Sequence, residues 1–192
     1  VVEEFKKEGL SAIGIVCHVG KDDQRKQLVS KTIAAFGRID ILVNNAATNP
    51  VYSPIEEIDP VIFDKIMEIN VKAPWALSNL VLPHLQANKN GSIINIASVE
   101  ALTPGYGLGV YSTSKAAILM LTKNQAKEWG TYGIKVNAIC PGLIKTKFSA
   151  ALWQNEKMLH KLEKSIPSGR MGKPEEMVGL ACLLVSNAGN YM

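Results

Sequence analysis

Short apolar runs alternate with longer amphipathic stretches along most of this chain. The runs are rich in Val and Ile, as buried strands are, and they lie at Ala12 to Cys17, Ile39 to Val43, Ser92 to Ala97 and Ile134 to Ile139. Strands of this kind, separated by helices, are typical of a parallel sheet covered on both faces. The pattern therefore predicts an α/β fold.

The stretches between the runs carry helix signals. The opening residues 1–9 are typical of the last turns of a helix closed by Gly9, and Asp22 or Asp23 can cap a helix that ends at Gly37. Further helices are predicted at Pro60 to Ile69, Val71 to Ala87, Val110 to Gly130 and Pro174 to Ser186.

The stretch at 145–170 differs from the rest, because it mixes Trp153, Met158, Leu159 and Leu162 with charges. It follows the last predicted strand, beyond the carboxyl ends of the strands, where doubly wound folds bind ligands. This place favours a mobile helical lid over substrate, with an ordinary surface helix as the alternative.

Composition narrows the class of protein. With 192 residues, 47% of them hydrophobic, the chain can form one domain over 1–192, and it has no internal repeat or linker. The net charge of +4 is dispersed, without the basic stripe that nucleic-acid binding needs.

No run of about 18 apolar residues indicates a membrane helix. The three cysteines have no metal-ligand spacing, so we expect no metal site and a cytoplasmic protein.

Tyr111 and Lys115 form the most informative pair in the sequence, within the segment Y-S-T-S-K. A spacing of four on a helix puts the phenol and the ammonium on one face. A nearby cation stabilises phenolate, so the pair predicts a tyrosine whose pKa falls below about 10, towards the range of acid/base catalysis. Taken alone, the pair is more typical of a solvated amphipathic face than of a catalytic site.

Two residues give this pair a context. Ser98 follows the predicted strand 92–97, where its hydroxyl would face the ligand crevice and could hold a substrate oxygen. Asn70 lies between two predicted helices, where its amide can bond backbone at a helix break and hold a water near the lysine. A local cap is the alternative for Asn70.

Two further segments follow predicted strands. Asn44-Asn45-Ala46-Ala47 comes after the run at 39–43, and its small residues allow a ligand to approach the backbone. Pro141-Gly142-Leu143-Ile144-Lys145-Thr146 comes after the run at 134–139 and offers backbone donors and a hydroxyl. Plain turns are the alternative for each, but together and in this order the pieces favour a site.

With N-N-A-A, Asn70, Ser98, Y-S-T-S-K and P-G-L-I-K-T, the chain resembles the short-chain dehydrogenase/reductase family over almost its whole length. The resemblance implies a Rossmann-like, doubly wound parallel sheet and an oxidoreductase that uses NAD(P)(H) on a small carbonyl or secondary alcohol. It makes Tyr111 the general acid/base, Lys115 its partner and a ligand of the nicotinamide ribose, Ser98 the orienting group and Asn70 a member of the proton relay.

The same resemblance implies the cofactor site, which would be lined by His18, Val19, Asn45, Ala46, Tyr111, Lys115, Pro141, Gly142, Ile144 and Thr146. Most of the family carries an acidic residue where His18 stands, so His18 is either a substitute donor or a strand-end residue. Cys17-His18-Val19-Gly20-Lys21 and Asn49-Pro50 are similar to a branch of carbonyl and retinal reductases that favours NADP(H) over NAD(H).

The family's Gly-rich phosphate loop is not among these residues. In the strand order 3-2-1-4-5-6, the run at 12–17 would be the third strand and that at 39–43 the fourth, and these two are not neighbours. We therefore expect the natural protein to have about 55 to 60 more residues before Val1, enough for one β-α-β unit, and a last strand after Met192.

Two hypotheses follow. The first is an enzyme that moves hydride between a nicotinamide cofactor and a carbonyl or alcohol. The alternative is a truncated, non-catalytic family member that acts as an interaction partner in oligomers. Because the predicted helices at 71–87 and 110–130 resemble those that pair subunits in the family, we expect a homotetramer or homodimer.

Overall fold

The computed structural model describes residues 1–192 apart from the side chain of Met158, so that this part of the predicted lid lies outside the described residues. Three parallel strands form one sheet in the order β1 (Ile41–Asn44), β2 (Gly91–Ile96) and β3 (Ile134–Ile139). The order is that of the 4-5-6 half of a doubly wound sheet. The predicted Rossmann-like α/β class is confirmed.

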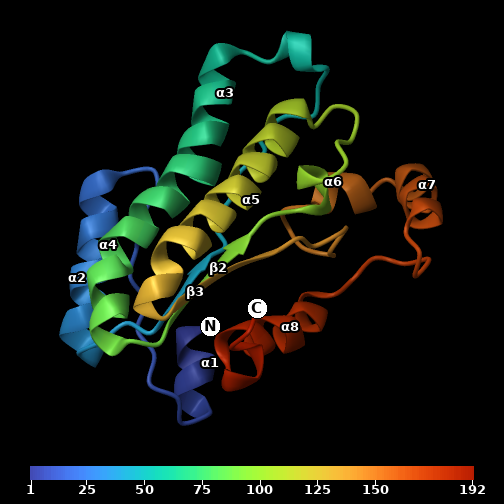
Figure 1. The fold of residues 1–192 in the computed structure, drawn as a ribbon. Coiled ribbons are helices and arrows are strands. Elements are labelled where there is room, and N and C mark those ends of the chain that lie inside the picture. Colours follow the sequence, from blue (N-terminus) through green and yellow to red (C-terminus); the bar gives the residue numbers. More distant parts are fainter.

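Helices cover both faces of this sheet (Figure 1). On one side lie α2 (Asp22–Phe36), α3 (Pro60–Met67), α4 (Ala73–Asn88) and α5 (Gly109–Trp129). On the other side lie α1 (Val2–Lys7) and α8 (Val178–Val185), while α6 (Ala150–Trp153) and α7 (Glu156–Ser165) follow β3 away from the sheet.

Short turns of other helix types join these elements. The turn η2 (Glu68–Lys72) is a π-helix, and the 3₁₀ turns are η1 (Ile55–Glu57), η3 (Val99–Ala101), η4 (Gly130–Tyr132), η5 (Pro174–Met177) and η6 (Asn187–Gly189). The predicted closing helix at 174–186 is thus a 3₁₀ turn followed by α8.

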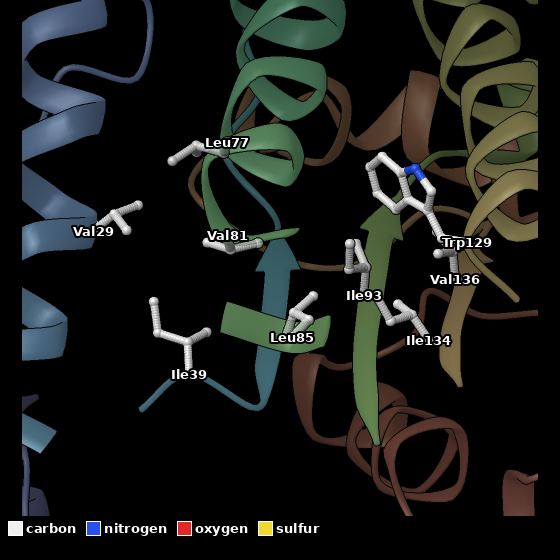
Figure 2. Packing of buried hydrophobic residues seen from close by; sticks show 9 residues of the cluster. All are labelled: Val29, Ile39, Leu77, Val81, Leu85, Ile93, Trp129, Ile134 and Val136. Carbon is white, nitrogen blue, oxygen red and sulfur yellow. The ribbon is translucent and has the colours of Figure 1, made fainter. Parts of the chain in front are cut away.

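The core lies on the two faces of β2, where successive side chains point to opposite sides. Ile93 belongs to the cluster between the sheet and the helices α2, α4 and α5 (Figure 2), whereas Ile94 packs with Ile139 and Leu184 under α8. This two-sided burial explains why Ile93, Ile94 and Ile96 are apolar on both faces of β2. The first cluster contains Val29, Ile39, Leu77, Val81, Leu85, Ile93, Trp129, Ile134 and Val136.

Local signals explain several helix ends. The Asp59 side chain accepts a hydrogen bond from the Val61 N–H at 2.7 Å, and Pro60 is the first residue of α3. Gly37 ends α2 with a φ of 77°, in the left-handed region that glycine tolerates.

The predicted strand at 12–17 is wrong, because these residues form no strand in the structure. An extended run becomes a strand only when a neighbour pairs with its backbone, and none of the described strands lies beside it. The run is largely exposed, with Val16 at 100% of its surface. The free edge of β1 likewise leaves Ile41 and Val43 about half exposed.

Candidate active site

The predicted site segments meet at one edge of the sheet. Because the three strands are parallel, their carboxyl ends lie on the same side, and Asn45, Ser98 and Pro141 follow β1, β2 and β3 there. This is the edge at which doubly wound folds bind ligands. The structure therefore brings together segments that are far apart in the sequence.

Tyr111 and Lys115 share one face in the first turns of α5, as the spacing predicted. The Lys115 Nζ atom lies 5.6 Å from the centroid of the Tyr111 ring and donates a 2.8 Å hydrogen bond to the Ile96 carbonyl at the end of β2. Lys115 is only 3% exposed. Its ammonium is thus held between α5 and the sheet, and the alternative of a solvated face is wrong.

Burial moves the pKa values of this pair in opposite directions, since it disfavours each charged form. It raises the pKa of Tyr111 above 10, an effect that a hydrogen bond with Ser98 reduces and the negative charge of Glu100 increases. It lowers the pKa of Lys115 to about 8. The predicted lowering of the tyrosine pKa is therefore not found, because desolvation outweighs the one lowering effect, the hydrogen bond with Ser98.

Ser98 lies between β2 and the tyrosine. It is buried, and its Oγ accepts a 3.2 Å hydrogen bond from the Glu100 N–H, which starts the turn η3. Its side chain also interacts with the Tyr111 phenol and lowers the pKa of that group. Cys140 adjoins the same group, since its thiol interacts with the Ser98 backbone and with the Lys115 charge.

Asn70 lies in the π-turn η2 and is 1% exposed. Its Oδ1 accepts from the Thr48 N–H at 2.8 Å, and its Nδ2 donates to the Thr48 carbonyl at 2.9 Å and to Ser114 Oγ at 3.0 Å. Ser114 in turn donates to the Tyr111 carbonyl at 2.7 Å. Asn70 therefore joins the loop after β1 to the helix that carries Tyr111, and it is not a local cap.

Part of the predicted cofactor site lines a hollow of about 140 Å³ beside the end of β1, which includes Val19, Asn45 and Ala46. The Gly20 backbone packs closely against Ile69, which also lines this hollow. A Cβ at Gly20 would lie 2.9 Å from Ile69 Cδ1. His18 is exposed, and its Nδ1 accepts a 3.2 Å hydrogen bond from the Gly20 N–H. The structure thus gives His18 a turn-forming role outside the hollow's lining.

The segment 141–146 is held to the residues that follow it. Ile144 pairs with Gly172 through an isolated bridge, Ser149 Oγ donates to the Ile144 carbonyl at 2.6 Å, and Trp153 Nε1 donates to the Thr146 carbonyl at 3.0 Å. The Phe148 ring lies 6.2 Å from the Tyr111 ring. The start of the predicted lid therefore adjoins the tyrosine.

Sequence reasoning missed three groups at the site. Asn44 donates to Asn95 Oδ1 at 2.8 Å, and Asn95 donates to Thr122 Oγ1 at 2.9 Å, so that a buried polar chain links β1, β2 and α5. Ser114 donates to the Tyr111 carbonyl, and the Glu100 N–H donates to Ser98 Oγ. The Asn44-Asn45 pair was a visible signal, but contacts between distant segments leave no spacing pattern for the others.

A second hollow lies away from these residues. An open groove of about 820 Å³ runs between the ends of α3 and α4 and Leu121 of α5, and it contains none of the predicted site residues. Titratable groups converge at Tyr111 and not in this groove, and volume alone carries no reactivity.

Among the described residues, no group of three or more His, Cys, Asp and Glu side chains is placed to hold a metal ion. Within the same residues, every helix is too short or too polar to cross a membrane.

A family model described as enoyl-(acyl carrier protein) reductase matches residues 1–192. The chain is also 41% identical to dehydrogenase/reductase SDR family member 4 of Oryctolagus cuniculus, over all of this chain and 74% of that protein. The chain belongs to the short-chain dehydrogenase/reductase family. It is accordingly a dehydrogenase/reductase enzyme of that family.

Solved structures agree with this assignment to the short-chain dehydrogenase/reductase family. A gluconate 5-dehydrogenase from Burkholderia cenocepacia in complex with NADP and tartrate has a TM-score of 0.95 and 31% identity. The match spans 100% of this chain and 74% of the dehydrogenase chain. An NAD⁺-bound xylitol dehydrogenase has a TM-score of 0.91 and 25% identity. The match spans 99% of this chain and 78% of the xylitol dehydrogenase chain.

Proposed function

We propose that the protein transfers a hydride between a nicotinamide cofactor and a carbonyl or secondary alcohol, with Tyr111 exchanging the proton. One observation carries the proposal: Ser98, Tyr111 and Lys115 converge at the carboxyl edge of the sheet, in a chain of the short-chain dehydrogenase/reductase family. The same convergence favours an enzyme over a non-catalytic partner.

The residues at this edge fit a nicotinamide cofactor. The Lys115 ammonium has three donors, and its hydrogen bond to the Ile96 carbonyl uses one of them, which leaves others for a ribose hydroxyl. Asn45 and Ala46 line the hollow beside β1, and residues 141–146 would hold the carboxamide side with backbone groups. When bound there, the cofactor supplies or accepts the hydride.

Tyr111 performs the proton transfer. Its raised pKa keeps the phenol protonated at neutral pH, the state in which it can donate to a carbonyl oxygen during reduction. In the oxidative direction the phenol oxygen takes the proton from the alcohol. The protonation state of the isolated site therefore favours reduction.

The other residues orient the reactants. Ser98 donates a hydrogen bond to the substrate oxygen beside the phenol, which holds that oxygen within reach of the proton. Asn70 fixes Thr48 and, through Ser114, the backbone of Tyr111. In this proposal Asn70 completes the proton relay from that position.

NADP(H) is the preferred cofactor in this proposal. The NADP complex of the gluconate 5-dehydrogenase supports it, whereas the NAD⁺-bound xylitol dehydrogenase shows that the fold also accepts NAD⁺. Parallel titrations of the purified protein with NADPH and NADH test this preference.

We propose further that residues 145–170 form a lid over the substrate, and that the protein works as a homotetramer or homodimer in the cytoplasm. Phe148 beside Tyr111 supports the lid. The three free cysteines agree with a reducing compartment.

The reaction class is tested with NADPH deuterated at C4 of the nicotinamide and a panel of neutral aldehydes and ketones. The proposal predicts an alcohol product with deuterium on the former carbonyl carbon. Cofactor that binds but is never oxidised by any member of the panel, or deuterium that appears only in water, would contradict the proposal.

A further inference from the structure

Glu100 lies directly beside the proposed machinery but has no role in the mechanism above. It belongs to the turn η3 that follows Ser98, and its N–H donates to Ser98 Oγ. The residue is half-buried, and its side chain faces Gly105 and Ser112. A carboxylate in this position needs hydrogen-bond donors to offset the cost of burial.

One carboxylate oxygen supplies most of the contacts. Glu100 Oε2 accepts from the Gly105 N–H at 2.6 Å and from Ser112 Oγ at 2.9 Å. Gly105 belongs to the loop 102–108, and Ser112 is the residue after Tyr111. A single side chain thus joins the end of β2, this loop and the first turn of α5.

The loop is built for this contact. A Cβ at Gly105 would lie 3.0 Å from Glu100 Oε1 and 3.1 Å from Oε2, so the glycine allows the close approach. At the other end of the loop, the Ser53 N–H donates to the Gly107 carbonyl at 3.1 Å. The loop is therefore held on both sides, and Glu100 holds the side nearer Tyr111.

The Glu100 carboxylate also stabilises the N-terminus of α5. The N-cap of α5, Leu108, makes no side-chain hydrogen bond to the helix, so the helix has no local cap of its own. A carboxylate near a helix N-terminus interacts favourably with the helix dipole. Glu100, which belongs to η3, places its negative charge beside the first turn of α5, the turn that contains Tyr111.

We propose that Glu100 is a positioning residue for the Ser98–Tyr111 pair, because its carboxylate holds the loop 102–108 and the first turn of α5 against the end of β2. The proposal rests on the function proposed above. Its charge has a second effect, since it contributes to the raised pKa of Tyr111.

The test compares Glu100→Ala and Glu100→Gln with the wild-type protein, and uses Glu128→Ala, an exposed carboxylate on the far part of α5, as the matched control. Reductive kcat and KM are measured with saturating NADPH over a range of pH, together with the Kd of NADPH and the unfolding midpoint. Ser112→Ala removes one of the two bonds and provides a milder variant.

Glu100→Ala should lower reductive kcat at least about tenfold, while the Kd of NADPH changes less than about twofold, because misplacement of reacting groups acts on the transition state. Glu100→Gln keeps an oxygen acceptor, so its kcat should stay within about threefold of wild type. The alkaline limb of its kcat profile should move to lower pH, since the charge that raises the pKa of Tyr111 is gone.

Wild-type kcat in Glu100→Ala would overturn the proposal, as would a Glu100→Gln variant with an unmoved alkaline limb and a kcat as low as that of Ala. If Glu100→Ala does not fold, Glu100→Gln and Ser112→Ala decide by the same criteria. Failure of the proposed function is a different result, in which the wild-type protein itself does not oxidise NADPH with any carbonyl.

Discussion

At the scale of single residues, burial sets the protonation of the two groups that define the site. It raises the pKa of Tyr111 and lowers that of Lys115 to about 8. At neutral pH the phenol is therefore neutral and most of the lysine is still charged. The site holds one proton donor and one cation in the same small volume.

If Lys115 holds the cofactor as proposed, its charge should make cofactor binding depend on pH. As pH rises through about 8, the buried ammonium loses its proton and with it the attraction for the anionic cofactor. We expect the affinity for NADPH, measured by fluorescence titration, to fall over this window. In Lys115→Arg the guanidinium keeps its charge, so the decline should be much smaller.

Lys123→Arg, an exposed lysine on the same helix, is the control for this titration and should follow the wild-type curve. An affinity that does not change between pH 7 and 9, or a decline of the same size in Lys115→Arg, would show that Lys115 does not hold the cofactor.

Gln125 is a residue of α5 whose buried side-chain amide destabilises the folded state. It is 4% exposed, and its Oε1 and Nε2 have no hydrogen-bond partner among the described residues. Buried polar groups without partners cost about 1–3 kcal/mol, so Gln125→Leu should raise the free energy of unfolding by about 1–2 kcal/mol. Urea unfolding measures this change.

Gln27→Leu, at an exposed position of α2, should change the same free energy by less than about 0.5 kcal/mol. A destabilised Gln125→Leu variant would mean that the amide makes a favourable contact of its own.

At the scale of elements, the π-turn η2 depends on one side chain that reaches two other segments. Asn70→Ala removes the bonds to both backbone groups of Thr48 and to Ser114. Leaving these buried groups unpaired should cost about 1–3 kcal/mol of unfolding free energy. Reductive kcat should fall as well, because Ser114 bonds the Tyr111 carbonyl.

The exposed Asn124→Ala on α5 is the control for Asn70, with stability and kcat close to wild type. Thermal unfolding and initial rates measured on the same samples provide both readouts. Wild-type stability in Asn70→Ala would show that the turn is held by its neighbours instead.

Elements with local signals could be predicted from the sequence, and those that depend on distant partners could not. Pro60 and Gly37 mark helix ends by their own backbone preferences, and both predictions are confirmed. The run at 12–17 has the composition of a strand but no neighbouring strand to pair with. The π-turn at Asn70 likewise depends on Thr48 and Ser114, which the local sequence does not reveal.

In the candidate site too, features with a local signal could be predicted, and features that depend on distant partners could not. The spacing of Tyr111 and Lys115 placed both on one face, which the structure confirms. The direction of the tyrosine pKa was wrong, because the effect of burial depends on the packing of the whole edge of the sheet. Glu100 could not be found at all, since its partners lie in a loop and a helix further along the chain.

At the scale of the whole molecule, the outer face of α4 and α5 leaves apolar side chains in solvent. Trp75 is 50% exposed beside the open groove, and Met120 is 56% exposed. We expect light scattering to give the mass of a dimer or tetramer, and Trp75→Glu to lower it by placing a charge in the interface.

Tyr132→Glu is the control for Trp75, because Tyr132 is equally exposed but lies in η4 beyond the end of α5. A wild-type protein that is monomeric at all concentrations would rule out the proposed assembly.

Proton transfer by Tyr111 is best examined with Tyr111→Phe, because the substitution removes one hydroxyl and keeps the ring. The measurement is reductive kcat with saturating NADPH, paired with an NADPH titration of the same sample. Tyr111→Phe should lose at least about 100-fold in kcat, with the Kd of NADPH changed less than about twofold. A Tyr111→Phe variant that keeps appreciable turnover would contradict the account.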